Sequence, residues 1–174
     1  MSGLAALSRD AIYAADASLR APPPPDPIAA RPAPLWPLLP AVVLLAPLYG
    51  AAMGSYGLAD PGRRDIALYA AIKAPMLMLV TMGVCLAPLL VLAHIARLPG
   101  TLRSALAAIL SGQACAAAVL AAASPTTLMI YTGIRSHDHA ILYNAGVFGL
   151  AALLGHRATL QRFRPLIAAH ARGW

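Results

Sequence analysis

The chain has 174 residues, of which 60% are hydrophobic and only 11% are charged. A soluble domain carries about 25% charged residues, so this composition excludes an ordinary water-soluble protein and indicates one embedded in lipid. The net charge of +7 reflects 13 basic against 6 acidic residues. Because the arginines flank apolar segments and form no aromatic-rich basic patch, we expect them at a membrane surface and not on nucleic acid.

The first 33 residues are expected to form a separate N-terminal part. Residues 2–20 carry an approximate apolar stripe at helical spacing, which predicts a short amphipathic helix. The sequence APPPPDPIAARPAP follows, and its prolines prevent both helix and sheet. We therefore expect residues 1–33 to be a cytoplasmic amphipathic helix and an extended proline-rich arm, followed by a transmembrane domain at residues 34–157.

The first apolar segment, residues 35–58, is long enough to cross a bilayer. Prolines in its first half are expected to kink it. Ala46, Gly50 and Gly54 follow at four-residue spacing, which lets another helix backbone approach closely. That neighbouring helix belongs either to the same bundle or to a foreign subunit, and the sequence leaves both alternatives open.

The second segment, residues 66–94, is too long for one perpendicular crossing. A kink at Pro75 is expected to divide it into an interfacial piece and a span over residues 74–94. The interfacial piece contains Lys73, the only lysine of the chain. Its ammonium group either reaches the interface past Tyr69, one turn away, or binds an anionic group inside the membrane.

The third and fourth segments cover residues 102–130 and 139–155. The third is rich in alanine, and such a small-residue helix is expected at a central position that touches several neighbours. The fourth is preceded by Ser136 as its expected cap. It carries Gly146 and Gly149 as further candidates for helix packing or a partner interface. The chain is therefore predicted to be an all-α integral membrane protein, with four transmembrane helices and kinked, Gly/Ala-rich packing faces.

The tail, residues 158–174, mixes arginines with apolar residues and predicts a basic amphipathic segment on anionic lipid. The membrane-surface arginines of this end are Arg157, Arg162, Arg164 and Arg172. Four crossings put both termini on one side, which then holds nine arginines against three on the other. The positive-inside rule places both termini in the cytoplasm of a bacterial inner membrane.

Two uncharged amides, Gln113 and Asn144, lie inside the third and fourth segments. They either form hydrogen bonds between helices or, with Lys73, line a conduction path. The sequence contains no glutamate, and every aspartate lies in a tail or a turn. Because proton pumps and cation carriers use carboxylates inside the membrane, we do not expect either activity.

His137, Asp138 and His139 form the only cluster of potential metal ligands in the sequence, and no further ligand follows at helical spacing. No metal site is therefore predicted, and Asp138 fits the first turn of a helix. No cofactor is predicted either, although ligation of haem or (bacterio)chlorophyll by His94, His139 or His156 stays open. The chain has no phosphate-binding loop, nucleophile elbow or HExxH pattern, so we do not expect an enzyme.

Three stretches, YGAAMGSYG, AIKAP and YNAGVFGLAAL, resemble a family of uncharacterised bacterial multi-pass inner-membrane proteins. The resemblance covers about residues 35–165. It implies a membrane topology and carries no assigned activity. Members of that family often continue into further helices, which implies that this shorter form relies on a partner.

The sequence thus favours a small non-catalytic membrane subunit that packs against and stabilises a larger bacterial complex of respiratory, photosynthetic or secretory kind. The expected partners are other integral membrane subunits and anionic lipids at the cytoplasmic surface. Two alternatives stay open. One is a small transporter or channel whose path is lined by Lys73, Gln113 and Asn144. The other is a pigment- or haem-binding subunit.

Overall fold

The computed structural model describes residues 38–59, 65–95, 102–133 and 136–171, together with Tyr13 and Asp16. In this part the chain is all-helical, which confirms the all-α part of the predicted fold class. The elements in chain order are α2 (Leu38–Gly54), the 3₁₀ helix η1 (Ser55–Ala59), α3 (Asp65–Ile95), α4 (Leu102–Gly133) and α5 (His137–Ala171). Apart from Tyr13 and Asp16, the expected N-terminal helix and proline-rich arm lie outside the described residues, and so does Arg172.

Three helices of the described part are long and apolar enough to cross a membrane. Their spans are Leu38–Gly57, Asp65–Pro88 and Ala105–Gly133. This agrees with the predicted membrane class, because a run of about 20 apolar residues matches the thickness of the hydrocarbon core. Helix α5 is not among the three, since its shorter apolar part contains Asn144 and is bounded by His139 and His156.

The second segment is one helix and not two, so the division expected at Pro75 is wrong. Helix α3 runs through both Pro75 and Pro88 over 31 residues. A proline removes one backbone hydrogen bond, and membrane helices tolerate this loss when neighbouring groups compensate. At about 1.5 Å per residue the helix is about 46 Å long, which exceeds a hydrocarbon core of about 30 Å. Helix α3 must therefore tilt or extend beyond the core.

Two other helix boundaries differ from the expected ones. Helix α2 ends at Gly54, where the chain tightens into η1 and the Ser55 hydroxyl donates to the Ala52 carbonyl at 2.7 Å. Helix α5 does not end at Gly155 but continues into the basic tail as far as Ala171, and its whole length is 35 residues. Its start agrees with prediction, because Ser136 precedes the first turn and its carbonyl accepts the Ala140 amide at 3.3 Å.

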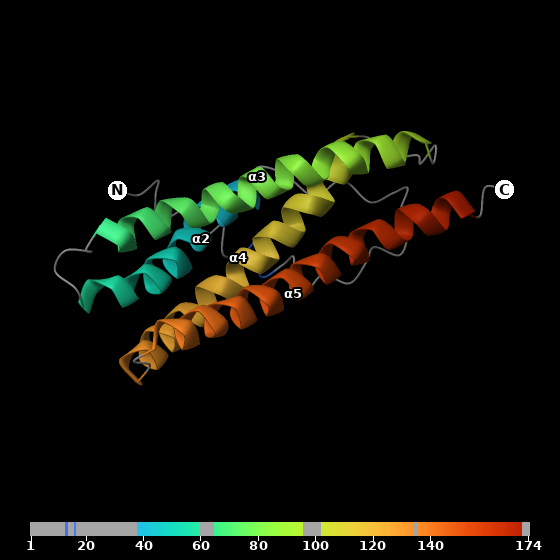
Figure 1. Ribbon diagram of the computed structural model, residues 1–174. Coiled ribbons are helices and arrows are strands. Elements are labelled where there is room, and N and C mark those ends of the chain that lie inside the picture. Colours follow the sequence, from blue (N-terminus) through green and yellow to red (C-terminus); the bar gives the residue numbers. More distant parts are fainter. Residues whose placement is uncertain are drawn as a thin grey trace.

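Helix α4 occupies the centre of the described bundle, as its alanine-rich sequence predicts. It contacts α2, α3 and α5, and Figure 1 shows it passing between α3 (green) and α5 (orange to red). Its buried positions are mostly small, and they include Ala105, Ala107, Ala108, Ala114, Ala116 and Ala117. Small side chains let neighbouring backbones approach from several directions, and in lipid this close packing stabilises helix pairs.

Glycines mark two close helix crossings. A Cβ atom added at Gly50 would meet the Ala70 carbonyl oxygen and would lie 2.9 Å from the Ala71 Cα atom, both on α3. A Cβ at Gly54 would meet the backbone of Ala67 on the same helix. Of the two alternatives for this α2 face, the structure therefore shows packing within the chain. Ala46, one turn before Gly50, is fully buried as well.

The second crossing joins α4 and α5. A Cβ added at Gly112 would lie 2.7 Å from the Gly155 carbonyl oxygen, and one added at Gly155 would lie 2.7 Å from the Gly112 carbonyl oxygen. Real Cβ atoms essentially never come this close to other heavy atoms. The backbones of α4 and α5 can therefore touch here only because both positions are glycine.

Candidate functional site

A hydrogen-bonded network of polar side chains joins three helices inside the bundle. The Tyr49 hydroxyl on α2 donates to Asn144 Oδ1 on α5 at 2.9 Å. In turn, Asn144 Nδ2 donates to the Tyr131 hydroxyl on α4 at 2.6 Å. Asn144 therefore bridges two neighbouring helices with both ends of its amide. This is one of the two roles expected for it, whereas the two tyrosine partners were not predicted.

The hydroxyl groups of Thr127 and Tyr143 form a separate polar contact between α4 and α5. Thr127 Oγ1 on α4 donates to the Ala123 carbonyl at 2.9 Å and lies 3.3 Å from the Tyr143 hydroxyl on α5. Because the single Thr127 proton is used in the bond to Ala123, Tyr143 is the donor in the other contact. Thr127 is fully buried. This pair gives α4 and α5 a second polar connection.

Aromatic contacts extend the network towards the end of the bundle where α4 and α5 are joined. The Tyr56 ring packs edge-on against Tyr131, with 5.3 Å between centroids, and lies 5.8 Å from the His137 ring. On the other side, Tyr49 makes an edge contact with Phe148 at 5.3 Å. Mid-span tyrosines are the sequence signal that could have revealed this network, since a buried phenol needs a polar partner.

The network can hold helices together but offers little chemistry. It contains amide and hydroxyl groups and no carboxylate, and among the described residues no group of His, Cys, Asp and Glu side chains could hold a metal ion. Histidines 137 and 139 and Asp138 are exposed at the start of α5. Interhelical hydrogen bonds in membrane proteins each contribute on the order of 0.6 kcal/mol. Their sum supports the fixed mutual placement of α2, α4 and α5.

The three intramembrane polar residues expected to share a path lie in different places. Lys73 is exposed on α3, with Nζ 5.8 Å from the Tyr69 ring centroid, which fits the expectation that it reaches past this ring. Asn144 lies in the network. Gln113 lines a groove whose described lining includes neither of the other two. Neither this groove nor the depression over α5 brings the three side chains together.

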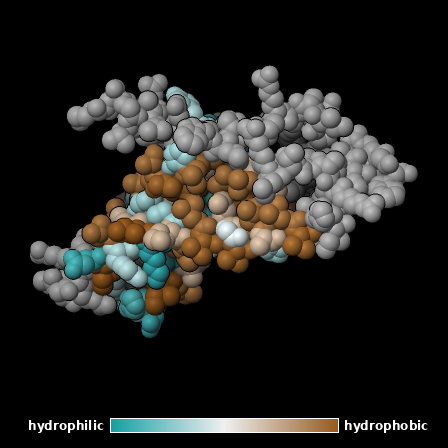
Figure 2. Space-filling model, turned by 90° about the horizontal axis from the view of Figure 1, so that it is seen from above, coloured by the Kyte–Doolittle hydropathy of each residue, from teal (hydrophilic) through white to brown (hydrophobic). Residues whose placement is uncertain are grey.

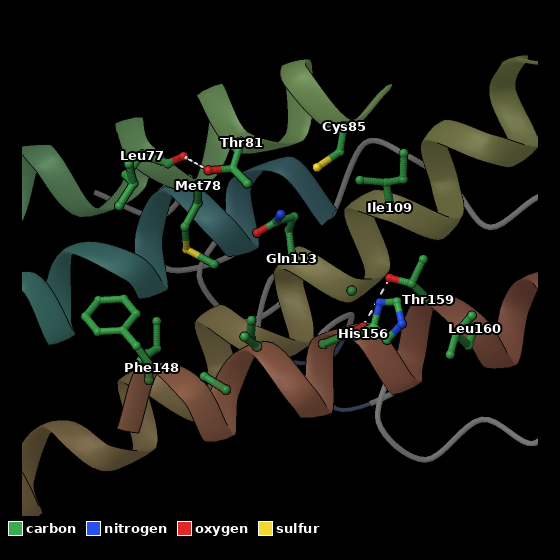
Figure 3. A pocket seen from close by; sticks show the side chains of 16 residues that line it. Leu77, Met78, Thr81, Cys85, Ile109, Gln113, Phe148, His156, Thr159 and Leu160 are labelled. Atoms are coloured by element: carbon green, nitrogen blue, oxygen red, sulfur yellow. Dashed lines mark hydrogen bonds between the residues drawn. The ribbon is translucent and has the colours of Figure 1, made fainter. Parts of the chain in front are cut away.

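The groove that contains Gln113 is bounded by α3, α4 and α5 and has a volume of about 530 Å³. Figure 3 shows Gln113 rising from α4 between Thr81 and Cys85 on α3 and His156 and Thr159 on α5. The end of the groove near Phe148 is apolar. The groove residues Leu77, Met78, Leu120 and Phe148 supply hydrocarbon and aromatic surface there. Sequence reasoning singled out Gln113 but not this groove, which depends on how far apart α3 and α5 lie.

The outer face of α5 is open at two glycines. Among the described residues, no atom lies within 4 Å of a Cβ built at Gly146 or at Gly149. A shallow depression over this face is lined by His139, Leu142, Tyr143, Gly146, Val147 and Leu150. The opposite side of the molecule, seen from above in Figure 2, where α3 is the uppermost helix in Figure 1, is also largely hydrophobic in its described part. Gly146 and Gly149 thus differ from Gly50 and Gly54, which already contact α3.

The basic residues near the C-terminal end are only partly described. Arg157 is exposed, and the Arg162 side chain is partly buried. Burial lowers the pKa of the Arg162 guanidinium, which nevertheless stays protonated at neutral pH. Arg164 belongs to α5, but its side chain lies outside the described part.

Comparison of the chain with protein-family models, with curated proteins and with solved structures finds no match. The resemblance to uncharacterised inner-membrane proteins therefore stays an expectation.

Proposed function

We propose that this protein is a small non-catalytic subunit that packs against a larger membrane complex through the outer face of α5. The observation that carries this proposal is the open space at Gly146 and Gly149. A glycine inside a helix costs about 0.5–1 kcal/mol relative to alanine. Close helix packing offsets this cost at four glycines, because another backbone comes close to each of them: Gly50, Gly54, Gly112 and Gly155.

At Gly146 and Gly149 no helix of the described chain packs closely enough to offset this cost. A helix of another subunit could approach this face as closely as α3 approaches Gly50. The depression over Gly146 is flanked by Leu142 and Leu150, which are 72% and 55% exposed. These side chains would pack on either side of an incoming helix. Small residues between bulky ones are typical of helix–helix contacts in membranes.

Helix α3 is less suited to a close helix contact. Its exposed face carries large apolar side chains along most of its length, including Leu68, Ile72, Met76, Val80 and Val84. Such a face is matched by fluid lipid, which accommodates irregular bulk without close backbone approach. Gly83 is the exception on this helix and also faces open space.

The proposal requires α5 to cross the membrane as a fourth helix. Its support is that α5 packs along the membrane-spanning helix α4. Its outward side chains between the two histidines are apolar and exposed, namely Ile141, Leu142, Leu150, Leu153 and Leu154. Four crossings would put both termini on the arginine-rich side of a bacterial inner membrane, which is the cytoplasmic side by the positive-inside rule.

The test is native-gel migration of the tagged protein after gentle extraction from its own membranes. We expect the wild type to migrate well above the 18.0 kDa of one chain, and the Gly146→Leu/Gly149→Leu double variant to migrate as a single chain. Gly83→Leu is the matched control, because it fills an open glycine on another helix and should leave the assembly intact. If the double variant retains the wild-type mobility, the α5 face is not the interface. Co-expression with a differently tagged second copy separates self-association from a foreign partner.

A further inference from the structure

The groove between α3, α4 and α5 has the size of a ligand site. Its volume of about 530 Å³ lies within the range of about 300–1,000 Å³ that is usual for pockets that bind small molecules. From Phe148 to Leu160 the groove follows α5 for about 18 Å. An elongated occupant can therefore lie along this helix.

Polarity changes along the groove. Phe148 lies at the end nearer the middle of the bundle, whereas the polar side chains of His156 and Thr159, together with the apolar Ile109 and Leu160, lie nearer the C-terminal end of α5 (Figure 3). Gln113 lies between these ends and makes no hydrogen bond within the described part of the chain. An occupant that is apolar at one end and polar at the other matches this order. The polar end lies nearer the arginine-rich end of α5, where the head groups of the bilayer are expected. A lipid molecule of the bilayer therefore fits the groove best.

The polar end offers both hydrogen-bond donors and acceptors. The hydroxyl protons of Thr81 and Thr159 are already donated to the carbonyls of Leu77 and Gly155, at 2.7 Å and 3.1 Å, so their oxygens can only accept. The Gln113 amide and the imidazole of His156 retain N–H groups. A head group that carries ester oxygens together with a hydroxyl group, such as a phosphoglycerol, is the chemical complement.

Arg162 is not among the residues that line the groove, but it places a positive charge about one turn beyond Thr159 at this end. It follows Thr159 by three residues and Gly155 by seven, so helical spacing places it on the side of α5 that lines the groove. Its side chain is partly buried and forms no ion pair among the described residues. A partly buried cation is stabilised by a nearby anion. The polar end of the groove therefore favours an anionic head group over a zwitterionic one.

We infer that this groove binds an anionic phospholipid, with its phosphate at Arg162 and one acyl chain along Leu120 and Phe148. Gln113 and His156 would donate to the ester oxygens. The inference rests on the proposed membrane crossing of α5, but it does not require a partner on the Gly146 face. The lipid would close the gap between α3 and α5 and so join the otherwise separate walls of the groove.

The test is native mass spectrometry of the full chain, purified in neutral detergent, stripped of lipid and titrated with phosphatidylglycerol or phosphatidylcholine. We expect one phosphatidylglycerol per chain to bind about tenfold more tightly than phosphatidylcholine, which corresponds to one hydrogen bond to a charged group. Arg162→Gln should remove this preference. Arg157→Gln is the matched control, because Arg157 is exposed and lies off the groove side of α5, and it should preserve the preference.

A second variant tests the acyl-chain end. Ala152 lines the groove and is exposed, so Ala152→Phe should fill the groove without disturbing the packed core, and it should weaken both lipids. Equal binding of the two lipids by the wild type would overturn the inference, and so would an Arg162→Gln variant that behaves like Arg157→Gln. The Gly146→Leu/Gly149→Leu variant should bind phosphatidylglycerol normally. A failed partner interface and a failed lipid site therefore give different results.

Discussion

The Tyr49 hydroxyl donates a 2.9 Å hydrogen bond to Asn144 Oδ1, although the two residues are 95 positions apart in the chain. Tyr49 is fully buried, so this bond lies inside the bundle and not at its surface. Through Asn144 the contact reaches Tyr131 as well. One amide therefore ties α2 to α4 and α5, and the stability of the bundle should depend on it.

Replacing Asn144 by leucine should destabilise the protein by about 1–3 kcal/mol, because it leaves the Tyr49 hydroxyl without its acceptor and Tyr131 without its donor. Tyr49→Phe removes one hydroxyl and should cost about 0.6 kcal/mol, since the Asn144–Tyr131 bond remains. The free energy of unfolding can be measured by SDS titration in mixed micelles. An Asn144→Leu variant as stable as Tyr49→Phe would show that the bond between Asn144 and Tyr131 contributes nothing beyond the one to Tyr49.

Substitution by alanine should have different effects at Gly50 on α2 and at Gly149 on α5. At Gly50 the added Cβ would meet the backbone of Ala70 and Ala71, so Gly50→Ala should cost about 1–3 kcal/mol through overpacking. At Gly149 the added Cβ meets no atom within 4 Å, so Gly149→Ala should be neutral or stabilise the isolated chain by up to about 1 kcal/mol. Unfolding of both variants in the same detergent compares them directly. Similar losses at both positions would contradict the described placement of α3 against α2.

The apolar segments, the fold class and the central position of α4 could be predicted from the sequence, because each depends on the composition of a single segment. The side of each helix that packs against a neighbour could not be predicted from the sequence, because it depends on how the helix is rotated relative to the other helices. Gly50 and Gly146 look alike in sequence, yet a Cβ added at Gly50 would meet α3, whereas one added at Gly146 would meet no atom of the described residues within 4 Å. The hydrogen bond between Asn144 and Tyr49 could not be predicted from the sequence for the same reason.

The two cysteines should react at very different rates. Cys85 is exposed on α3 and lines the groove, whereas Cys115 is only 1% exposed inside α4. Because alkylation requires access to the thiol, maleimide should add once per chain in mild detergent and twice after unfolding in SDS. Intact-mass measurement counts the adducts. Two adducts on the folded chain would contradict the burial of α4.

The number of crossings can be determined by reporter fusions. If α5 crosses the membrane, a fluorescent protein fused after Trp174 and one fused before Met1 should both fluoresce from the cytoplasm, while alkaline phosphatase inserted between α4 and α5 should be active outside it. If α5 instead lies along the surface, the two termini fall on opposite sides of the membrane. The fusion at the C-terminus therefore decides between three crossings and four.

The bond between Tyr49 and Asn144 also constrains how the protein is made. The ribosome completes α2 long before it reaches α5, so the Tyr49 phenol enters the lipid without its eventual acceptor. A nascent or truncated chain that stops before Asn144 leaves this donor unsatisfied within the hydrocarbon, where water cannot replace the missing oxygen. Incomplete chains should for this reason be less stable and more readily degraded than their hydrophobicity alone implies.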